Sequence, residues 1–279
     1  MYIIDGKEIS KKVKEEVKEK VKELPSKPKL LVVMVGNNVA SKIYVEAKEK
    51  ACKNVGIDAK TICLDEFASQ KEVIDIIEKA NSNPKINAIL VQLPLPEHMN
   101  TEKVLNTISP MKDVDGLTSI NQGKLFMGLN CIVPCTPKGI MRLFKEYNVN
   151  LSGKNAIVIG RSLLVGKPLA MLMLKENATV TIAHSKTKDL AGACIDKDII
   201  VSAVGKQKLI TEEMVKDGAI IIDVGMNRVH GTIVGDVDYY AVKDKVARIT
   251  PVPGGVGPMT IASLLENVVE CYLIQKAVI

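Results

Sequence analysis

Three side chains between positions 41 and 48 have the types and the spacing of a catalytic or binding surface. Ser41, Tyr44 and Lys48 stand at i, i+3 and i+7 of residues 40–54, a stretch that reads as a helix. At this spacing a hydroxyl, a phenol ring and an amine share one helix face. If the helix follows a parallel strand, that face forms a pocket wall. The alternative is an exposed, lysine-rich helix with a half-buried tyrosine.

Two further polar side chains follow apolar segments. Gln92 lies near the end of segment 86–93, and ligands bind at the carboxyl ends of parallel strands. Asp115 belongs to the segment Lys112-Asp113-Val114-Asp115-Gly116, and its two carboxylates, two residues apart, indicate a loop because they would not share a helix face. A carboxylate in a pocket loop can accept hydrogen bonds from an amidine-like ring edge. Solvated turn carboxylates are the alternative.

Residues 155–168, Asn-Ala-Ile-Val-Ile-Gly-Arg-Ser-Leu-Leu-Val-Gly-Lys-Pro, have the order strand, glycine turn, helix. In dinucleotide-binding folds such a turn presents backbone N–H groups and a helix N-terminus to a phosphate. Gly160 and Gly166 do not form the usual G-x-G-x-x-G pattern, so an ordinary strand-to-helix connection is the alternative.

The residues after the next apolar segment indicate which dinucleotide would bind. Segment 178–183 ends at His184-Ser185-Lys186-Thr187, where an NAD site usually has an acidic residue. Hydroxyls and positive charge suit a 2′-phosphate, which a carboxylate would repel. We therefore predict an NADP site with Arg161, Ser162 and Ser185 at the phosphate.

A second glycine-rich segment, residues 251–260, reads Pro-Val-Pro-Gly-Gly-Val-Gly-Pro-Met-Thr. Its prolines restrict the backbone, and its glycines allow a ligand to approach the backbone closely. It either places backbone N–H groups against a cofactor, which we favour, or serves as a tight connector.

Strands and helices alternate along the chain. We expect strands at 29–35, 58–64, 86–93, 156–159, 178–183, 198–204 and 219–224. We expect helices at 8–24, 40–54, 70–82, 101–108, 140–147, from 167 onward, 211–216 and about 258–276. This alternation predicts an α/β fold with two layered domains, a junction near residue 139 and a cleft at a fixed interface.

The composition restricts the class of protein. Of 279 residues, 47% are hydrophobic and 3% aromatic, so aliphatic side chains must fill the cores, as in buried parallel sheets. The net charge of +6 comes from dispersed lysines, without the basic and aromatic clusters of nucleic-acid-binding proteins. With no signal sequence or membrane-length apolar segment in view, we expect a cytoplasmic protein that binds neither nucleic acid nor membrane.

The six cysteines form no C-x-x-C pair, and the three histidines are far apart in the sequence. We expect no metal site, and we expect free, buried thiols in a reducing compartment.

In this order, the motifs closely resemble those of the bifunctional methylenetetrahydrofolate dehydrogenase/cyclohydrolase family, nearly end to end. The resemblance rests on Ser41-Lys42-Ile43-Tyr44-Val45-x-x-Lys48, Val91-Gln92-Leu93-Pro94-Leu95-Pro96, Lys112-Asp113-Val114-Asp115-Gly116, Pro134-Cys135-Thr136-Pro137, Gly160-Arg161-Ser162-x-x-Val165-Gly166-x-Pro168, His184-Ser185-x-Thr187, Gly235-Asp236-Val237 and residues 250–260.

The resemblance implies two reactions. An NADP-linked oxidation converts 5,10-methylenetetrahydrofolate to 5,10-methenyltetrahydrofolate, and hydrolysis then gives 10-formyltetrahydrofolate. It also implies a folate-binding domain at 1–139, a Rossmann-type NADP-binding domain at 140–260, a C-terminal helix (about 261–279) that packs on the first domain, and a homodimer. A shikimate-type NADP-dependent dehydrogenase and a catalytically silent folate- or nucleotide-binding protein are the alternatives.

The resemblance assigns roles as well. It implies Lys48 as the amine of the hydrolytic step, Gln92 as its hydrogen-bonding partner, Tyr44 as a ring that stacks on the folate, and Asp115 as the group that fixes the pterin edge. The substrate-binding residues that it implies are Ser41, Tyr44, Gln92, Leu93, Asp115, Pro253 and Gly254. The cofactor-binding residues that it implies are Thr136, Gly160, Arg161, Ser162, Val165, Gly166, His184, Ser185, Thr187, Gly225, Met226, Gly257 and Thr260.

Overall fold

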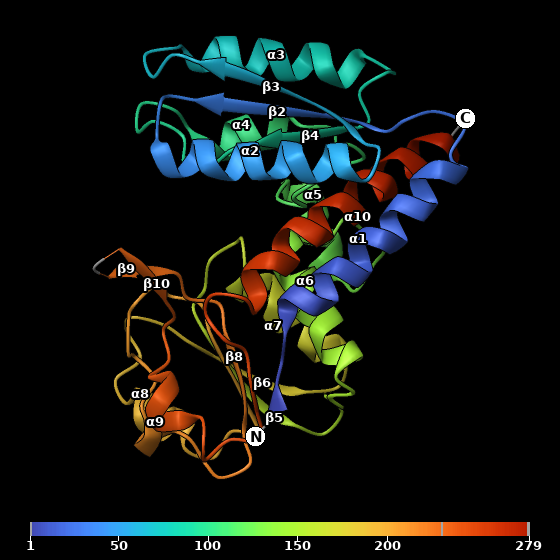
Figure 1. The fold of residues 1–279 in the computed structure, drawn as a ribbon. Helices are drawn as coiled ribbons and strands as arrows, with labels where there is room; N and C mark the ends of the chain where they lie inside the picture. The colour runs from blue at the N-terminus through green and yellow to red at the C-terminus, as the bar shows by residue number, and fades with distance from the viewer. Residues whose placement is uncertain (1, 230, 278–279) are drawn as a thin grey trace. The chain divides into compact units, whose positions relative to one another are not determined.

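The structure, a computed structural model, describes residues 2–229 and 231–277. The chain divides into two compact units, each built on its own parallel sheet (Figure 1). The three-stranded unit comprises Lys12–Lys124, Leu129–Cys135 and Ile261–Ile279. The six-stranded unit comprises Met1–Lys11, Leu125–Gly128 and Thr136–Thr260. The predicted α/β fold class is confirmed.

The sheet of the three-stranded unit has the order β3-β2-β4, and all its strands are parallel. Its strands are β2 (Lys29–Val35), β3 (Asp58–Leu64) and β4 (Ala88–Val91). The connecting helices α2 (Val39–Asn54) and α3 (Gln70–Ser82) lie on opposite sides of this sheet (Figure 1). Right-handed crossovers explain this, because the chain moves from β2 to one edge and then returns past β2 to the other.

Aliphatic side chains form the core of this unit. Six of the seven residues of the central strand β2 are buried, and Leu31, Val33 and Val35 form one cluster with Val73 and Ile77 of α3. Two short helices, α4 (Thr101–Thr107) and α5 (Ser119–Phe126), follow β4.

Two long helices also contribute to the three-stranded unit. Helix α1 (Gly6–Glu23) buries Val13, Val17 and Val21, which recur every fourth residue and so form one apolar stripe. Helix α10 (Val256–Ala277) is tied to this unit by hydrogen bonds. The hydroxyls of Tyr272 and Ser26 lie 2.9 Å apart, and the Gln275 amide donates to the Asn87 carbonyl at 2.7 Å.

The six-stranded unit has the strand order β1-β11-β8-β7-β5-β6, with every pairing parallel. Its strands are β1 (Tyr2–Ile3), β5 (Asn155–Ile159), β6 (Thr179–Ala183), β7 (Ile199–Ser202), β8 (Ile220–Asp223) and β11 (Arg248–Ile249). From β5 the chain forms β6 on one side and then returns to form β7 on the other. Ligands bind at such a switch point in open α/β sheets.

Shorter elements complete this unit. Its helices are α6 (Cys135–Glu146), α7 (Gly166–Lys175), α8 (Leu190–Cys194), a 3₁₀ turn (Glu212–Met214) and α9 (Tyr239–Val242). Strands β9 (Asn227–Val229) and β10 (Thr232–Val234) form an antiparallel pair. None of the helices in the described ranges is both long and apolar enough to span a membrane.

Some predicted bounds were wrong. Helix α6 begins at Cys135, five residues before the predicted start, because Pro137 lies in the first helical turn, where its missing N–H leaves no bond unmade. The predicted helix 211–216 is only the 3₁₀ turn at Glu212–Met214. Helix α5 was not predicted, since it is short and has a glycine at its centre, Gly123.

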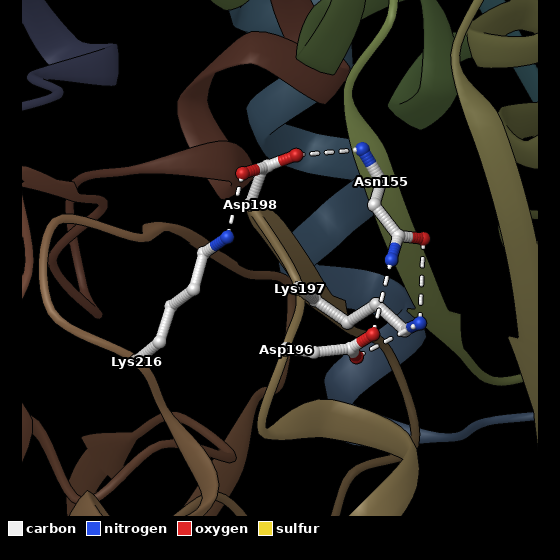
Figure 2. Close-up of polar contacts among 5 residues, drawn as sticks. All are labelled: Asn155, Asp196, Lys197, Asp198 and Lys216. Atoms are coloured by element: carbon white, nitrogen blue, oxygen red, sulfur yellow. Dashed lines mark hydrogen bonds and ion pairs between the residues drawn. The ribbon is translucent and has the colours of Figure 1, made fainter.

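A charged cluster ties together the amino ends of β5 and β7 (Figure 2). One carboxylate oxygen of Asp198 accepts from the Asn155 backbone N–H at 2.7 Å, and the other accepts from Lys216 at 2.7 Å. Lys197 pairs with Asp196 at 3.0 Å and also reaches the Asn155 side chain. The charged groups pair with one another at the amino ends of the strands, whereas ligands bind at the carboxyl ends. We therefore assign the cluster a structural role.

The N-terminus of α1 packs tightly on the second glycine-rich segment. The Asp5 carboxylate accepts from the backbone N–H groups of Lys7 and Glu8, and the Lys7 N–H also donates to the Gly254 carbonyl at 3.0 Å. A Cβ atom on Gly6 would lie 1.7 Å from the Gly255 carbonyl oxygen. Only glycine therefore fits at position 6.

We expect Gly6→Ala to lower the free energy of unfolding by about 2 kcal/mol or more, since a backbone carbonyl must move to admit the methyl group. Urea denaturation of the full chain measures this. The matched control is Gly123→Ala in α5, where a Cβ would meet no atom within 4 Å. Alanine there should raise stability by about 0.5–1 kcal/mol. Equal effects of the two substitutions would contradict the packing argument.

Candidate functional site

The amine and the amide singled out in the sequence are in direct contact in the three-stranded unit. Nζ of Lys48 donates to Oε1 of Gln92 at 3.0 Å, and Nε2 of Gln92 donates to the Leu93 carbonyl at 2.8 Å. Lys48 is half-buried on α2, and Gln92 directly follows β4, where its backbone N–H bonds to the Val33 carbonyl. The second bond fixes the orientation of the amide, so its oxygen faces the amine.

The other two side chains of this helix differ in burial. Ser41 is buried, and its backbone N–H donates to the side chain of Asn38, which caps α2. Tyr44 is 38% exposed, so its ring is accessible to a ligand. Partial burial raises the pKa of the Tyr44 phenol above its ordinary value.

The segment that carries Asp115 runs beside β4. Ile89 and Asp113 form a parallel bridge, and the Ile89 N–H donates to the Lys112 carbonyl at 2.7 Å. After Asp113 the chain turns, because the Gly116 N–H donates to the Asp113 carbonyl at 3.1 Å, so Asp115 lies in the loop that follows the bridge. Asp115 therefore follows directly after a segment that pairs with β4, the strand that Gln92 also follows.

The charged residues before Asp115 in this motif are structural. The Asp113 carboxylate is buried and accepts from the backbone N–H groups of Leu117 and Thr118 and from the Asn121 amide. The Lys112 ammonium donates to three carbonyls at the end of α3, those of residues 80, 81 and 83, at 2.8–2.9 Å. Burial raises the pKa of Asp113 and lowers that of Lys112. Asp115 is only half-buried and can meet a ligand.

The glycine turn of the six-stranded unit is closely packed. Gly160 ends β5 with φ +125°, and a Cβ there would lie 2.6 Å from the Ala203 carbonyl oxygen. A Cβ on Gly166 would lie 2.1 Å from the Gly160 carbonyl oxygen. The Ser162 hydroxyl accepts from the backbone N–H of Val165, which is the N-cap of α7. Backbone N–H groups and a helix N-terminus are thus available at the switch point of the sheet.

The segment after β6 carries no carboxylate before position 189. His184 and Thr187 form a tight turn, in which the His184 N–H donates to the Thr187 hydroxyl at 2.9 Å. Ser185 is exposed, as are Arg161 and Ser162. The first acid, Asp189, accepts from the Gly192 N–H and caps α8. Donors and positive charge, without a competing carboxylate, fit a dinucleotide with a 2′-phosphate.

The remaining predicted cofactor residues occupy several loops and helices of this unit. The hydroxyls of Thr136 and Thr260 lie 2.9 Å apart. A Cβ on Gly225 would lie 2.1 Å from the Asp236 carboxylate, whereas Met226 is exposed. Gly257 lies within α10, where a Cβ would meet no atom within 4 Å, so its packing does not require glycine. Of the two predicted substrate residues here, Pro253 is exposed and Gly254 is buried with φ +113°.

Family models cover most of the chain. Residues 4–115 match the catalytic domain of tetrahydrofolate dehydrogenase/cyclohydrolase, and residues 134–276 match the NAD(P)-binding domain of the same family. The chain belongs to the tetrahydrofolate dehydrogenase/cyclohydrolase family. Dehydrogenase and cyclohydrolase are therefore the two activities of this chain, as the resemblance of its motifs implied.

Individual relatives are similar to this chain over nearly their whole length. A curated relative, the bifunctional protein FolD of Campylobacter hominis, is 54% identical over 274 residues, 97% of this chain and 96% of the relative. The crystal structure of the FolD dehydrogenase/cyclohydrolase from Campylobacter jejuni superposes with a TM-score of 0.97 at 46% identity, covering 98% of this chain and 99% of that one.

A Trypanosoma brucei methylenetetrahydrofolate dehydrogenase-cyclohydrolase, solved with NADP and an inhibitor, has a TM-score of 0.94 at 35% identity and covers 100% of this chain and 98% of that one. A shikimate dehydrogenase from Aquifex aeolicus, at 12% identity and a TM-score of 0.53, shares the fold alone.

The cysteines of this family member are free thiols, but they are not all buried as we predicted. Cys63 is exposed, because β3 is an edge strand whose side chains face solvent and core in turn. Cys131 is partly exposed. Among the described residues, no group of three or more His, Cys, Asp or Glu side chains could hold a metal ion.

Two buried acids in the NAD(P)-binding domain were not assigned a role from the sequence. Asp236 accepts from the Ser202 hydroxyl and from the backbone N–H groups of Val204, Gly205 and Lys206, which follow β7 at the switch point. Asp223, at the end of β8, accepts from three further N–H groups, those of residues 225, 236 and 237. Both acids stand in apolar, glycine-containing segments of the sequence. Since a buried acid requires hydrogen-bond partners, this pattern could have identified them.

Burial raises the pKa of Asp223 to about 6, from the ordinary value of 3.8. Because the folded state then binds its proton more tightly than the unfolded state, the stabilisation from protonation is complete below pH 3.8 and is lost as the pH rises through 6. Between pH 5 and pH 7 this group should therefore lower the free energy of unfolding by about 1 kcal/mol.

We expect Asp223→Asn to remove the part of the pH dependence of the unfolding free energy that Asp223 contributes. Urea denaturation at both pH values gives the difference in unfolding free energy between wild type and variant, in which the contributions of all other titrating groups cancel. The difference should favour the wild type by about 1 kcal/mol more at pH 5 than at pH 7. A difference that is the same at both pH values would show that Asp223 does not titrate in this range.

Proposed function

We propose that Lys48, held by Gln92, carries the proton transfers of the hydrolytic step in this bifunctional enzyme. The protein oxidises 5,10-methylenetetrahydrofolate to 5,10-methenyltetrahydrofolate with NADP and then hydrolyses the product to 10-formyltetrahydrofolate. The observation that carries the assignment is the 3.0 Å bond from the Lys48 amine to the Gln92 amide at the ligand-binding edge of the parallel sheet.

The oxidation needs no general base from the protein. A hydride leaves a carbon that lies between two nitrogens, and their lone pairs stabilise the resulting methenyl cation. NADP, when bound, supplies the hydride acceptor. The task of the protein is then to orient the two reactants, because correct orientation alone removes a large part of the barrier.

The hydrolysis does need proton transfer. Water attacks the methenyl carbon and must lose a proton, and the nitrogen that leaves this carbon must gain one. An amine within reach of both atoms can accept the first proton and donate the second. The Gln92 oxygen restrains the flexible lysine side chain, so that its nitrogen stays in one place during both transfers.

We assign the folate to the three-stranded unit, at the carboxyl ends of its parallel strands. The Tyr44 ring stacks on the pterin or the aminobenzoyl group, and the Asp115 carboxylate accepts hydrogen bonds from the pterin edge. The proposed substrate-binding residues are Ser41, Tyr44, Gln92, Leu93, Asp115, Pro253 and Gly254.

We assign the NADP phosphates to the glycine turn and to the segment after β6. Arg161, Ser162 and Ser185 supply the donors for the 2′-phosphate, and the exposure of all three supports this role. The remaining proposed cofactor residues are Thr136, Gly160, Val165, Gly166, His184, Thr187, Gly225, Met226, Gly257 and Thr260.

Three further proposals concern organisation. We propose residues 1–139 as the folate-binding domain, together with the C-terminal helix, and 140–260 as the NADP-binding domain. Within 1–139, the segments Met1–Lys11, Leu125–Gly128 and 136–139 cluster with the six-stranded unit instead. The family resemblance supports a homodimer. Six free thiols suit a reducing compartment such as the cytoplasm.

Lys48→Met should lower cyclohydrolase activity by about 10²–10⁴-fold, the range that general acid–base catalysis supplies. Dehydrogenase activity should persist, because the oxidation requires no proton transfer, so methenyltetrahydrofolate should accumulate. The absorbance of the methenyl product, followed with NADP and then with the cofactor omitted, separates the two steps. Lys50→Met, an exposed position on the same helix, is the control. Normal hydrolysis by Lys48→Met would remove the lysine from the mechanism.

Arg161→Ala should raise the KM for NADP by about 10–100-fold, as expected for loss of a charge-assisted hydrogen bond to a phosphate. The KM for NAD, which lacks that phosphate, should change by less than about twofold, so the preference for NADP should fall. Arg228→Ala, exposed on β9 of the same unit, is the control. An equal rise of the KM for NAD and NADP would place Arg161 elsewhere on the cofactor.

A further inference from the structure

A buried amide on α10 links the two chain segments that surround Asp115. Asn267 is fully buried, and its Nδ2 group donates to the Val114 carbonyl and to the Val133 carbonyl, each at 2.8 Å. A side-chain amide has two N–H donors, and here both are used on carbonyls from segments about 20 residues apart in the chain. Asn267 therefore fixes the spacing of these two segments.

One of these segments ends in a thiol that reaches the Asp115 carboxylate. Sγ of Cys135 lies 3.2 Å from Oδ1 of Asp115, to which it donates, and 3.6 Å from the Val114 carbonyl oxygen. Nδ2 of Asn267 also lies 3.6 Å from this sulfur. The amide thus holds both the backbone just before Asp115 and the group that contacts its carboxylate.

The backbone just after Asp115 is fixed as well. Gly116 has φ +64°, and a Cβ at this position would lie 2.4 Å from the Ile132 carbonyl oxygen. The Gln122 amide donates to the Gly116 carbonyl at 2.7 Å. With both neighbours held, the Asp115 carboxylate has little freedom left, which lowers the entropic cost of binding a ligand to it.

We propose that Asn267 is a positioning residue of the folate site, which acts through Cys135 and the Val114 backbone to orient the Asp115 carboxylate toward the pterin edge. This inference rests on the proposed role of Asp115 in folate binding. Replacing Asn267 with an apolar residue leaves the Val114 and Val133 carbonyls buried without these donors, so the two segments must separate or admit water. A purely structural asparagine would lower stability by the same route but would leave folate affinity unchanged.

The first test compares Asn267→Leu with Asn87→Leu. Asn87 is a buried amide of the same unit at the opposite edge of the sheet, just before β4, where its side chain accepts from the Lys29 N–H. We expect Asn267→Leu to raise the KM for methylenetetrahydrofolate by about tenfold, the equivalent of one hydrogen bond to a charged group. The KM for NADP should stay within about twofold, because the proposed ligand of the Asp115 carboxylate is the folate and not NADP. Asn87→Leu should lower Tm and leave both KM values unchanged.

A double-mutant cycle with Asp115→Ala decides between positioning and simple destabilisation. If Asn267 acts through Asp115, adding Asn267→Leu to Asp115→Ala should raise the folate KM no further. Additive effects of the two substitutions, or an unchanged folate KM in Asn267→Leu, would overturn the inference and leave the role of Asp115 standing. An unchanged folate KM in Asp115→Ala would overturn that role, and the inference with it.

The thiol provides a variant that does not depend on replacing the amide. Cys135→Ala removes the donor to Asp115 and should raise the folate KM severalfold. Cys135→Ser, which restores a hydroxyl donor, should return the KM to within about twofold of wild type. These variants settle the question if Asn267→Leu does not fold. Equal folate KM values for Cys135→Ala, Cys135→Ser and wild type would overturn the inference.

Discussion

Parallel strands stop at one edge of each sheet and leave backbone groups there that no neighbouring strand can pair. In both units buried polar side chains bind backbone groups of loops that lie outside the strands. Asp113 and Asn267 do so in the three-stranded unit, and Asp223 and Asp236 do so in the six-stranded unit. Since unpaired buried backbone groups are costly, these side chains determine the shape of the loops on which ligand-binding residues stand. The geometry of the site therefore depends first on these hydrogen bonds to the loop backbone.

The two reactions make different demands on such an edge. Hydride transfer requires two reactants in fixed relative orientation and no acid or base, so rigid loops are sufficient for it. Hydrolysis requires one mobile proton carrier kept in one place. In the function that we propose, the Lys48–Gln92 bond meets this second demand, and the Leu93 carbonyl fixes the orientation of the amide. One substrate position can therefore serve both steps.

Much of this arrangement could be predicted from sequence, for identifiable reasons. Strands 29–35 and 58–64 and helix 70–82 match to the residue. A buried aliphatic run marks the first strand, and the capping serine Ser69 marks the start of the helix. The shared face of Ser41, Tyr44 and Lys48 follows from helical spacing.

The rest depended on contacts between residues distant in the chain. Nothing near Asp236 in the sequence reveals that its partners lie 30 residues away, and nothing near Asn267 reveals that it reaches Val114. Helix α5 was not predicted because of a local feature, the glycine at its centre.

The segment from Lys112 to Gly116 shows what this division of labour means for sequence change. The Lys112 ammonium binds carbonyls at a helix end, the Asp113 carboxylate accepts from backbone N–H groups, and the Val114 side chain is fully buried. Asp115 carries the carboxylate that we propose for the folate, and Gly116 turns where no side chain fits. Five adjacent positions thus answer to five unrelated physical demands. A substitution at any one of the five positions should therefore be unfavourable, whatever residues stand at the other four.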